Sequence, residues 1–234
     1  MKRRNIIVLL IEAFFIGIIL FSLLSIFKWS NEKKISNKEI HDIKEKVINK
    51  KKDINFKELK RINKDVVGWI KVPNTSIDYP VVRTSNNDYY LNHSFRRNNS
   101  NAGWIFMDYR NKLDGSDNNI VMYGHNRLDG IMFGHLKKLL NKDWFNNKDN
   151  LYIEFITDKD KNTYKIFSIY KIKDDTYYLN TKVNNYNKFI NKLKSRSIYN
   201  FNTELTGENI VTLSTCTIND DYRLVVHAIK TEKK

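Results

Sequence analysis

Hydrophobic residues follow three different patterns along this chain, and the first is an almost unbroken apolar run. From Ile6 to Phe27, 17 of 22 residues are Ile, Leu, Val or Phe, and the one charged residue is Glu12. A run of this length can cross a lipid bilayer as a helix. Insertion of each of these side chains is favoured by roughly 0.3 to 0.6 kcal/mol, which outweighs a cost of about 3 kcal/mol for Glu12. We therefore expect a transmembrane helix over residues 6–27.

The second pattern is a polar segment with apolar residues at helical spacing. Residues 28–54 are rich in Lys and Glu and contain neither Pro nor Gly. Two groups of apolar residues, in this segment and just after it, recur at the spacing of one helix face. They are Ile40, Ile43 and Val47, followed by Phe56, Leu59 and Ile62. We interpret the first group as part of a solvated stalk helix and the second as a helix that packs on the domain that follows.

From Val66 onward the pattern changes to short runs rich in Val, Ile, Tyr, Phe and Thr, many of them separated by Asn, Asp or Gly, as is typical of β-strands. Two segments between the runs, GIMFGHLKKLLNKDWF and VNNYNKFINKLKSRS, predict short helices. Eight strands in about 170 residues predict one barrel or sandwich. The runs are VVGWIKV, SIDYPVV, GWIFM, NIVMY, LYIEFIT, TYKIFSIYKI, NIVTLSTC and YRLVVHAIK.

The net charge of +15 does not indicate a nucleic-acid partner, because it is unevenly distributed. Residues 28–64 carry 13 Lys and Arg against six Asp and Glu, and a basic segment beside an apolar run suits anionic lipid or cell-wall polymers. Lys2, Arg3 and Arg4 favour a cytoplasmic N-terminus, and the absence of an A-x-A pattern after the run favours an uncleaved anchor. We expect a cytoplasmic N-terminus at residues 1–5, an anchor at 6–27, a stalk at 28–54 and an extracytoplasmic domain at 55–234.

Cys216 is the only cysteine in the chain. One interpretation is an inert core residue, since free Cys is among the most buried residue types. The other is a nucleophile, which needs a nearby base or cation to lower the pKa of its thiol. His125 is a candidate base because it follows a predicted strand in NNIVMYGHN, although a surface-loop histidine fits equally well. Among the other histidines, His41 lies in the polar stalk, and His135 and His227 are expected to be structural.

Alternation in the last two predicted strands brings a cation toward Cys216. In NIVTLSTC it places Ser214 and Cys216 on one face. A tight hairpin between Cys216 and Arg223 would bring these two residues to the same edge of the sheet. Arginine suits a developing oxyanion because its guanidinium is always charged and offers several donors. The alternative is that Arg223 is an ordinary strand arginine in a surface ion pair. One Cys and five scattered His give no metal-ligand spacing.

The sequence TLSTC followed by an R-L-V-V-H-A strand, with YGHN upstream, resembles the sortase family of membrane-anchored cysteine transpeptidases. The resemblance extends to class B sortases over residues 55–230, because DVVGWIKVPNTSIDYPVV, NNDYYLNHSF, AGWIFMDYRN, MYGHN and MFGHLKK follow that class in order. It implies an eight-stranded sortase β-barrel with N-terminal helices and a helix inserted before the cysteine strand. It also implies that Cys216 is the nucleophile, His125 the general acid and base, and Arg223 the oxyanion stabiliser.

The resemblance further implies the partners of the reaction. The substrate would be an exported protein with a C-terminal sorting motif, which is cleaved after Thr and transferred through a thioacyl intermediate to a peptidoglycan amine. Neither step needs a metal or an organic cofactor. Five positions match residues that line the groove for the sorting peptide, and plain barrel packing is the alternative for each of them. They are Asn87, Leu91 and Ser214 on one side, and Tyr178 and Leu179 on the other.

Two departures and two rival functions accompany this hypothesis. The gap of seven positions from Cys216 to Arg223 is shorter than in many class B members, and Thr217 and Ile218 stand where the family often has an acidic residue. A cysteine protease that only hydrolyses its substrate is one rival, and formation of an amine adduct would distinguish a transpeptidase from it. The other rival is a non-catalytic wall-associated binding module, in which Cys216 would be an unreactive core residue.

Overall fold

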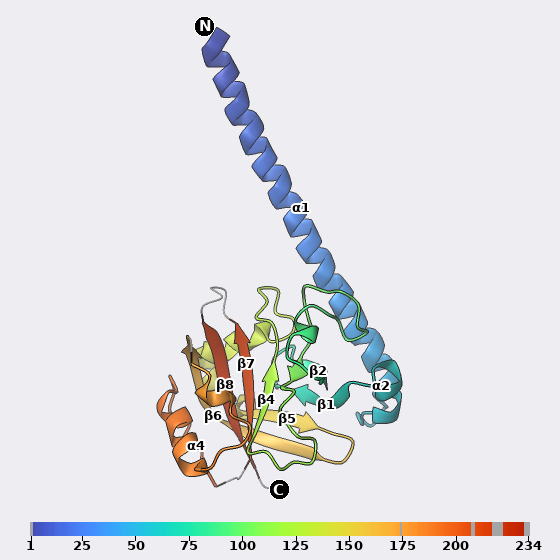
Figure 1. Cartoon of the computed structure of the whole chain (residues 1–234), viewed down its shortest axis with the longest axis vertical. Helices are drawn as coiled ribbons and strands as arrows, with labels where there is room; N and C mark the ends of the chain where they lie inside the picture. Colours follow the sequence, from blue (N-terminus) through green and yellow to red (C-terminus); the bar gives the residue numbers. More distant parts are fainter. Residues whose placement is uncertain (1, 174, 207–208, 217–221, 232–234) are drawn as a thin grey trace.

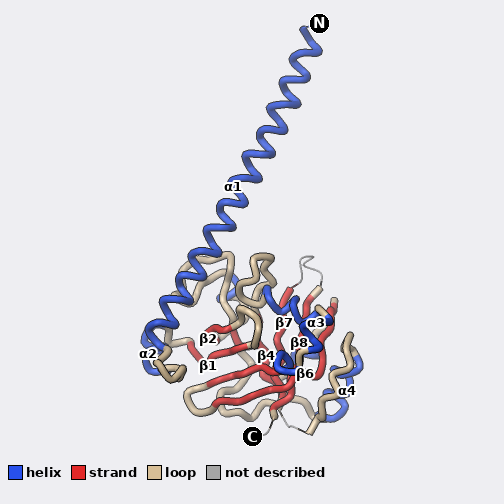
Figure 2. The backbone as a smooth tube through the Cα atoms, turned by 180° about the vertical axis from the view of Figure 1, so that it is seen from behind, coloured by secondary structure: helices blue, strands red, loops and turns tan. Residues whose placement is uncertain are grey.

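The protein consists of a long N-terminal helix and a domain built around a β-barrel (Figure 1). This computed structural model describes residues 2–173, 175–206, 209–216 and 222–231, without the side chains of residues 2–5 and of Cys216. The helix, α1 (Lys2–Val47), extends away from the barrel over its N-terminal part and lies against it at its C-terminal end (Figures 1 and 2). Among the described residues, α1 is the one helix long and apolar enough to cross a membrane, with a mean hydropathy of 2.9 in its most apolar window.

The last turns of α1 pack on the barrel and do not form a solvated stalk. Ile40, Ile43 and Val47 are buried in the main hydrophobic core. The expectation of a solvated helix was wrong here, because the spacing of these residues describes a face that is covered by protein. The second predicted helix is confirmed as α2 (Phe56–Ile62), which buries Leu59. The Asn55 side chain caps α2 by accepting a hydrogen bond from the Glu58 backbone N–H.

The eight predicted strands are all present, and they form a closed barrel in the order β1-β2-β3-β4-β7-β8-β6-β5. Two neighbouring pairs, β2 with β3 and β4 with β7, are parallel, and the others are antiparallel. A parallel pair needs a crossover, and the one between β4 and β7 contains β5, β6 and α4. The strands are β1 (Val66–Lys71), β2 (Asp78–Val82), β3 (Phe106–Met107), β4 (Asn119–Tyr123), β5 (Tyr152–Ile156), β6 (Lys161–Ile172), β7 (Ile210–Cys216) and β8 (Arg223–Lys230).

Side-chain alternation divides the apolar residues of the last two strands between two clusters. Along β8, Leu224 and Val226 belong to the main core, whereas Val225 and Ile229 belong to a second cluster on the opposite face of the strand. Helix α4 (Tyr186–Ser195) contributes its buried face to this second cluster. The apolar residues of both strands therefore alternate between two faces, and α4 is the predicted helix inserted before the cysteine strand.

The other predicted helical segment contains two short helices. Asn141 separates a 3₁₀ helix, η2 (Gly134–Leu140), from α3 (Lys142–Asn146). The Asn141 side chain accepts a hydrogen bond from the Asp143 N–H at 2.8 Å, which caps α3 and separates the two helices. The remaining 3₁₀ helices are η1 (Tyr89–Leu91), η3 (Lys148–Leu151) and η4 (Tyr177–Leu179).

Candidate active site

Strand register brings the backbones of the three predicted catalytic residues to one rim of the barrel. Strands β4 and β7 are parallel, with Tyr123 opposite Ser214. His125 and Cys216 each follow by two residues, so they lie at the same end of neighbouring strands. Cys216 is in turn paired with Arg223 across the β7–β8 hairpin, as predicted. The Cys216 side chain and the hairpin residues that depart from the family pattern lie outside the described part of the chain.

The His125 ring is held by backbone groups of the segment around η1. Its Nε2 lies 2.8 Å from the Leu91 carbonyl oxygen. Because a carbonyl only accepts hydrogen bonds, Nε2 carries a proton and donates it to Leu91, which leaves Nδ1 as the ring nitrogen that can exchange a proton. Gly103, at φ +57°, lies against the ring, and a Cβ there would approach His125 Cδ2 to 2.9 Å and the Tyr90 and Leu91 carbonyl oxygens to 2.7 Å. The ring therefore occupies a space that only glycine leaves open.

The loop that follows β4, residues 124–133, fixes the backbone of His125. The Phe133 N–H donates to the His125 carbonyl oxygen at 3.1 Å, and Asn126 forms an isolated bridge with Met132. Gly124 lies against the Phe133 ring, where a Cβ would come within 2.8 Å of the ring. These contacts close the loop on itself, so the position of His125 depends on the loop as well as on β4.

Two of the predicted substrate-binding residues are in contact with each other. The Ser214 hydroxyl lies 3.0 Å from the Tyr178 hydroxyl, and both side chains are buried. Asn87, Leu91 and Leu179 are partly exposed. The structure therefore connects the η4 segment directly to the cysteine strand, while the three partly exposed residues remain accessible at the surface.

The turn after β3 connects the two sides of the predicted groove. The Tyr109 N–H donates to Asn87 Oδ1 at 3.0 Å, and Arg110 Nη2 donates to the Leu179 carbonyl oxygen at 3.1 Å. The buried Asp108 carboxylate orients Arg110 through an ion pair of 2.8 Å. Burial raises the pKa of Asp108, but the hydrogen bonds from Arg110 outweigh this effect and hold that pKa below its usual value. Arg110 can therefore fix the η4 backbone with a charged, preoriented side chain.

A network of hydrogen bonds between buried polar side chains also holds the η4 segment. Asn119 Nδ2 donates to the carbonyl oxygens of Tyr178 at 2.9 Å and Asn180 at 3.0 Å, and its Oδ1 accepts from Thr212 Oγ1 at 2.6 Å. The Thr212 hydroxyl has then used its proton, so it accepts from Nδ1–H of His227 at 2.8 Å. Nε2 of His227 in turn accepts from the Tyr170 hydroxyl at 2.8 Å.

These hydrogen bonds require a neutral His227, and the surroundings of the His227 ring favour the neutral form. The side chain is completely buried. Burial, with a smaller contribution from the Arg196 charge, lowers the pKa of His227 to about 3. His227 is thus a structural histidine, as expected. His135 likewise has a structural contact, because its Nδ1 accepts a hydrogen bond from the Ser76 N–H at 3.0 Å.

Sequence reasoning missed the roles of Arg110, Asn119 and Thr212. Arg110 lies in AGWIFMDYRN, one of the family segments, which could have marked it for attention. Asn119 stands at the first position of a predicted apolar strand, where a polar residue is unusual enough to require a partner. That partner lies 59 positions away in the chain, and no local pattern reveals it.

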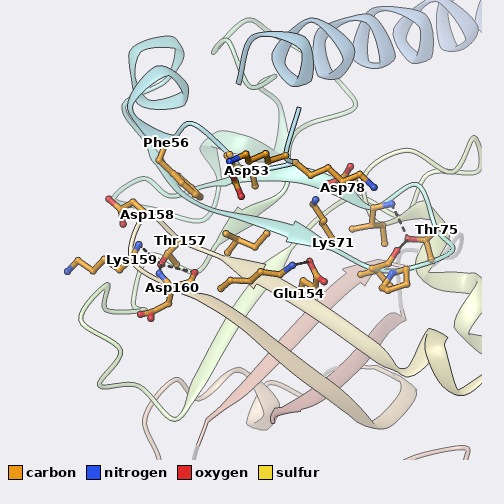
Figure 3. Close-up of a pocket in the computed structure, with 18 of the residues that line it drawn as sticks. Asp53, Phe56, Lys71, Thr75, Asp78, Glu154, Thr157, Asp158, Lys159 and Asp160 are labelled. Carbon is orange, nitrogen blue, oxygen red and sulfur yellow. Dashed lines mark hydrogen bonds and ion pairs between the residues drawn. The ribbon is translucent and has the colours of Figure 1, made fainter. Parts of the chain in front are cut away.

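An open cavity of about 800 Å³ (Figure 3) is lined by none of the predicted site residues. It is bordered by the segment between α1 and α2, the turn between β1 and β2, and the β5–β6 hairpin. Its lining carries charges of both signs, and Lys161 forms an ion pair with Glu154 at 3.2 Å. This mixed lining does not single out a ligand of one charge. Among the described residues, no group of three His, Cys, Asp or Glu side chains could hold a metal ion.

Comparisons with known proteins agree with this architecture. The sortase domain family matches residues 70–231. Sortase B of Listeria monocytogenes is 37% identical over 172 residues, which cover 71% of this chain and 69% of the relative. The crystal structure of Clostridium perfringens sortase B superposes with a TM-score of 0.70 at 36% identity and covers 76% of this chain and 100% of its own.

A Staphylococcus aureus sortase B–substrate complex superposes with a TM-score of 0.71 at 32% identity, covering 88% of this chain and 97% of its own. The family match spans most of the barrel, including β4, β7 and β8, which bring the backbones of His125, Cys216 and Arg223 to one rim. The chain therefore belongs to the sortase family and, within it, to the class B sortases, which are cysteine transpeptidases.

Proposed function

We propose that this sortase is a membrane-anchored enzyme that attaches exported proteins to the cell wall of a Gram-positive-type cell. Residues 6–27 of α1 would span the membrane, with Lys2, Arg3 and Arg4 on the cytoplasmic side and the barrel outside. The exposed apolar surface of this helix supports the proposal, since its most apolar window is not covered by the protein.

The catalytic roles are proposed for three residues. Cys216 is the nucleophile, His125 is the general acid and base, and Arg223 stabilises the oxyanion. The single observation that supports this assignment is the register that brings these residues to one rim, with Cys216 opposite Arg223 on the neighbouring strand. Arg223 is exposed, so its guanidinium is accessible to a peptide that lies over the rim.

The reaction consists of two acyl transfers. His125 takes the proton of the Cys216 thiol, the resulting thiolate attacks the carbonyl carbon of the threonine in the sorting motif, and the Arg223 guanidinium stabilises the oxyanion. The peptide C–N bond then breaks, and His125 protonates the departing amine, leaving a thioester on Cys216. A peptidoglycan amine attacks the thioester, His125 removes its proton, and the Cys216 thiol is regenerated. Every step uses side chains of this protein, without a metal or an organic cofactor.

The sorting peptide would lie in a groove with two sides. The segment around η1 forms one side, and η4 forms the other. Asn87, Leu91 and Leu179 supply the partly exposed side chains of this groove. Ser214 and Tyr178 are buried and hydrogen-bonded to each other, so their role is to join the floor of the groove to the η4 side. The groove is thus supported on both sides by residues that contact β3, β4 and β7.

Incubation of the full-length chain with a panel of threonine-containing sorting-motif peptides, with and without an amine acceptor, tests the function. We expect an acyl-enzyme on Cys216 by mass spectrometry and an amine adduct when the acceptor is present. Cleavage without an adduct at any acceptor concentration would indicate a hydrolase, which is the remaining alternative. Absence of both cleavage and acylation over the whole panel would contradict the assigned chemistry.

Matched variants test the residue roles. Cys216→Ala is expected to abolish acylation, and His125→Gln is expected to do so nearly completely. Arg223→Gln is expected to lower kcat by about 10²- to 10³-fold, as for the loss of an oxyanion donor. His41→Gln and Arg61→Gln are the controls, because both residues are exposed on helices outside the barrel. Unchanged kcat in Arg223→Gln would remove Arg223 from the mechanism.

A further inference from the structure

The membrane-proximal part of α1 contacts the loop that carries His125. Arg127 Nη1 lies 3.4 Å from Glu32 Oε2, and the same carboxylate accepts a hydrogen bond from Asn101 Nδ2 at 2.7 Å. The Arg127 guanidinium also lies 6.0 Å from the centre of the Trp29 ring and forms an ion pair with Asp129 at 2.9 Å. The Arg127 side chain is only 10% exposed, so this is a well-covered contact.

Further contacts fix the direction in which α1 leaves the barrel. The buried Glu39 carboxylate accepts hydrogen bonds from the Ser94 hydroxyl at 3.1 Å and the Arg96 N–H at 2.8 Å. Lys44 forms an ion pair with Asp78 at 2.7 Å. Contacts therefore follow the helix over several turns, and its orientation relative to the barrel does not depend on one interaction.

These contacts define the distance between the loop and the end of the apolar run. Phe27 is the last residue of that run, and Glu32 follows five residues later. At about 1.5 Å per residue this separation is only about 7.5 Å along the helix. The ends of β7 and β8 that carry Cys216 and Arg223 also lie on the side of the barrel from which α1 extends (Figures 1 and 2).

The surface next to this junction has the composition of a membrane interface. Leu128, beside Arg127 in the loop, is 59% exposed, and Trp29 is 40% exposed. Lys33, Lys137 and Lys138 lie close by, since their charges act together on His135, whose pKa is lowered by burial and by these three lysines. Lys137 Nζ also donates to the Leu128 carbonyl oxygen at 3.3 Å. Aromatic residues favour the interface, and lysines favour anionic head groups by about 1 kcal/mol each.

We propose that the loop of residues 124–133 rests on the outer surface of the bilayer, with Leu128 inserted among the lipid head groups and Lys33, Lys137 and Lys138 in contact with anionic lipid. The catalytic rim would then open directly onto the membrane surface. This inference rests on the proposed anchoring of α1 but goes beyond it, because an anchored barrel on a mobile stalk would keep the loop away from lipid. The contact of α1 with Arg127 and Asn101 instead holds the loop close to the end of the apolar run.

Single-site labelling of the full-length chain tests the proposal, since Cys216 is the only cysteine. In a Cys216→Ala background, Leu128→Cys carries an environment-sensitive fluorophore, and the protein is reconstituted into phosphatidylcholine–phosphatidylglycerol vesicles that contain lipids with a quencher near the head group. Lys159→Cys on the β5–β6 hairpin is the matched exposed control. It lies at the opposite end of β6 from Ile172, which is paired with Arg223.

We expect at least about twofold stronger quenching at position 128 than at position 159, because interfacial side chains lie only about 5–10 Å deep. Glu32→Ala combined with Asn101→Ala should lower the quenching at position 128 by releasing the loop from α1. Replacing the three lysines by Gln should lower it in anionic vesicles and have little effect in pure phosphatidylcholine. Equal quenching at positions 128 and 159 would overturn the proposal.

A label at Ser25→Cys, within the apolar run, tests the membrane anchor separately from the contact of the loop with lipid. Strong quenching of this label by lipids with a deeper quencher, together with none at position 128, would leave the anchor in place and refute the membrane-resting loop. Absence of quenching at both positions would refute the anchor as well. Circular dichroism and unfolding of each labelled chain show that the barrel is intact; Leu128 and Lys159 are exposed, so their replacement is compatible with folding.

Discussion

Replacing Asn119 by Ala should both destabilise the barrel and loosen the η4 side of the groove. The Asn119 side chain is fully buried, donates to the Tyr178 and Asn180 carbonyl oxygens and accepts from the Thr212 hydroxyl. In the Ala variant, water can reach the carbonyl of the exposed Asn180. The Tyr178 carbonyl and the Thr212 hydroxyl would remain buried without this partner.

The size of the effect follows from these two groups. An unsatisfied buried polar group costs about 1–3 kcal/mol, so the loss of a partner at two such groups should lower the free energy of unfolding of Asn119→Ala by about 2–6 kcal/mol. The effect on catalysis should appear mainly in KM for the sorting peptide, because Asn119 holds the backbone of the proposed groove and reaches no reacting atom. Denaturant unfolding of the full-length chain in detergent and steady-state kinetics measure the two effects separately.

The neighbouring asparagine provides a matched control. Asn118 is partly exposed, and its Oδ1 accepts a longer hydrogen bond, 3.3 Å, from the Val183 N–H. Asn118→Ala should therefore cost less than about 1 kcal/mol. Asn119→Asp keeps the acceptor for Thr212 but loses both donors, so it should be no more stable than Asn119→Ala. A cost in Asn119→Ala equal to that in Asn118→Ala, or a fully stable Asn119→Asp, would refute the reasoning.

Three further predictions follow from other contacts of the site. Gly103→Ala should lower kcat/KM at least about tenfold, since small displacements of a catalytic group are costly. Gly115→Ala is its control, with a similarly positive φ of +77° but no atom within 4 Å of the position that a Cβ would occupy. His227→Gln should flatten the acid dependence of unfolding: the pKa of His227 is lowered to about 3, so the unfolded chain binds the proton first. Wild-type stability is therefore lost as pH falls from about 6.5 toward 3, by up to about 1.4 kcal/mol per pH unit, and unfolding titrations at pH 7 to 4 measure the difference. Arg110→Lys should raise KM because a single ammonium cannot both pair with Asp108 in a fixed fork and reach the Leu179 carbonyl oxygen; an unchanged KM would argue against this role.

The strands could be predicted from the sequence because their information is local. All eight runs are strands, and the apolar residues of β7 and β8 alternate between two clusters, as the period of a strand requires. The pairing of Cys216 with Arg223 was also predictable, because a short hairpin leaves few registers. The sequence alone therefore predicts that the backbones of Cys216 and Arg223 meet at the rim.

Contacts between distant parts of the chain were not predictable in this way. The spacing of Ile40, Ile43 and Val47 shows that they share a helix face, but it does not show what covers that face, and the barrel does. Asn119 and Arg110 donate hydrogen bonds to backbone carbonyls of η4, which lie 59 and 69 positions further along the chain. Such pairs depend on the crossover from β4 to β7, which no local periodicity describes.

The buried polar contacts connect the end of the barrel at which β4 begins to the rim that holds His125 and the backbone of Cys216. Asn119 begins β4 and His125 follows its other end, so the two residues lie at opposite ends of one strand. Asn119 holds the Tyr178 carbonyl oxygen, and the Tyr178 hydroxyl contacts Ser214, two residues before Cys216. A change at the base of β4 can therefore reach the cysteine strand through η4 without displacing β4 itself. This route predicts that Asn119→Ala combined with Ser214→Ala costs less than the two single changes together, because Tyr178 loses its position in either one.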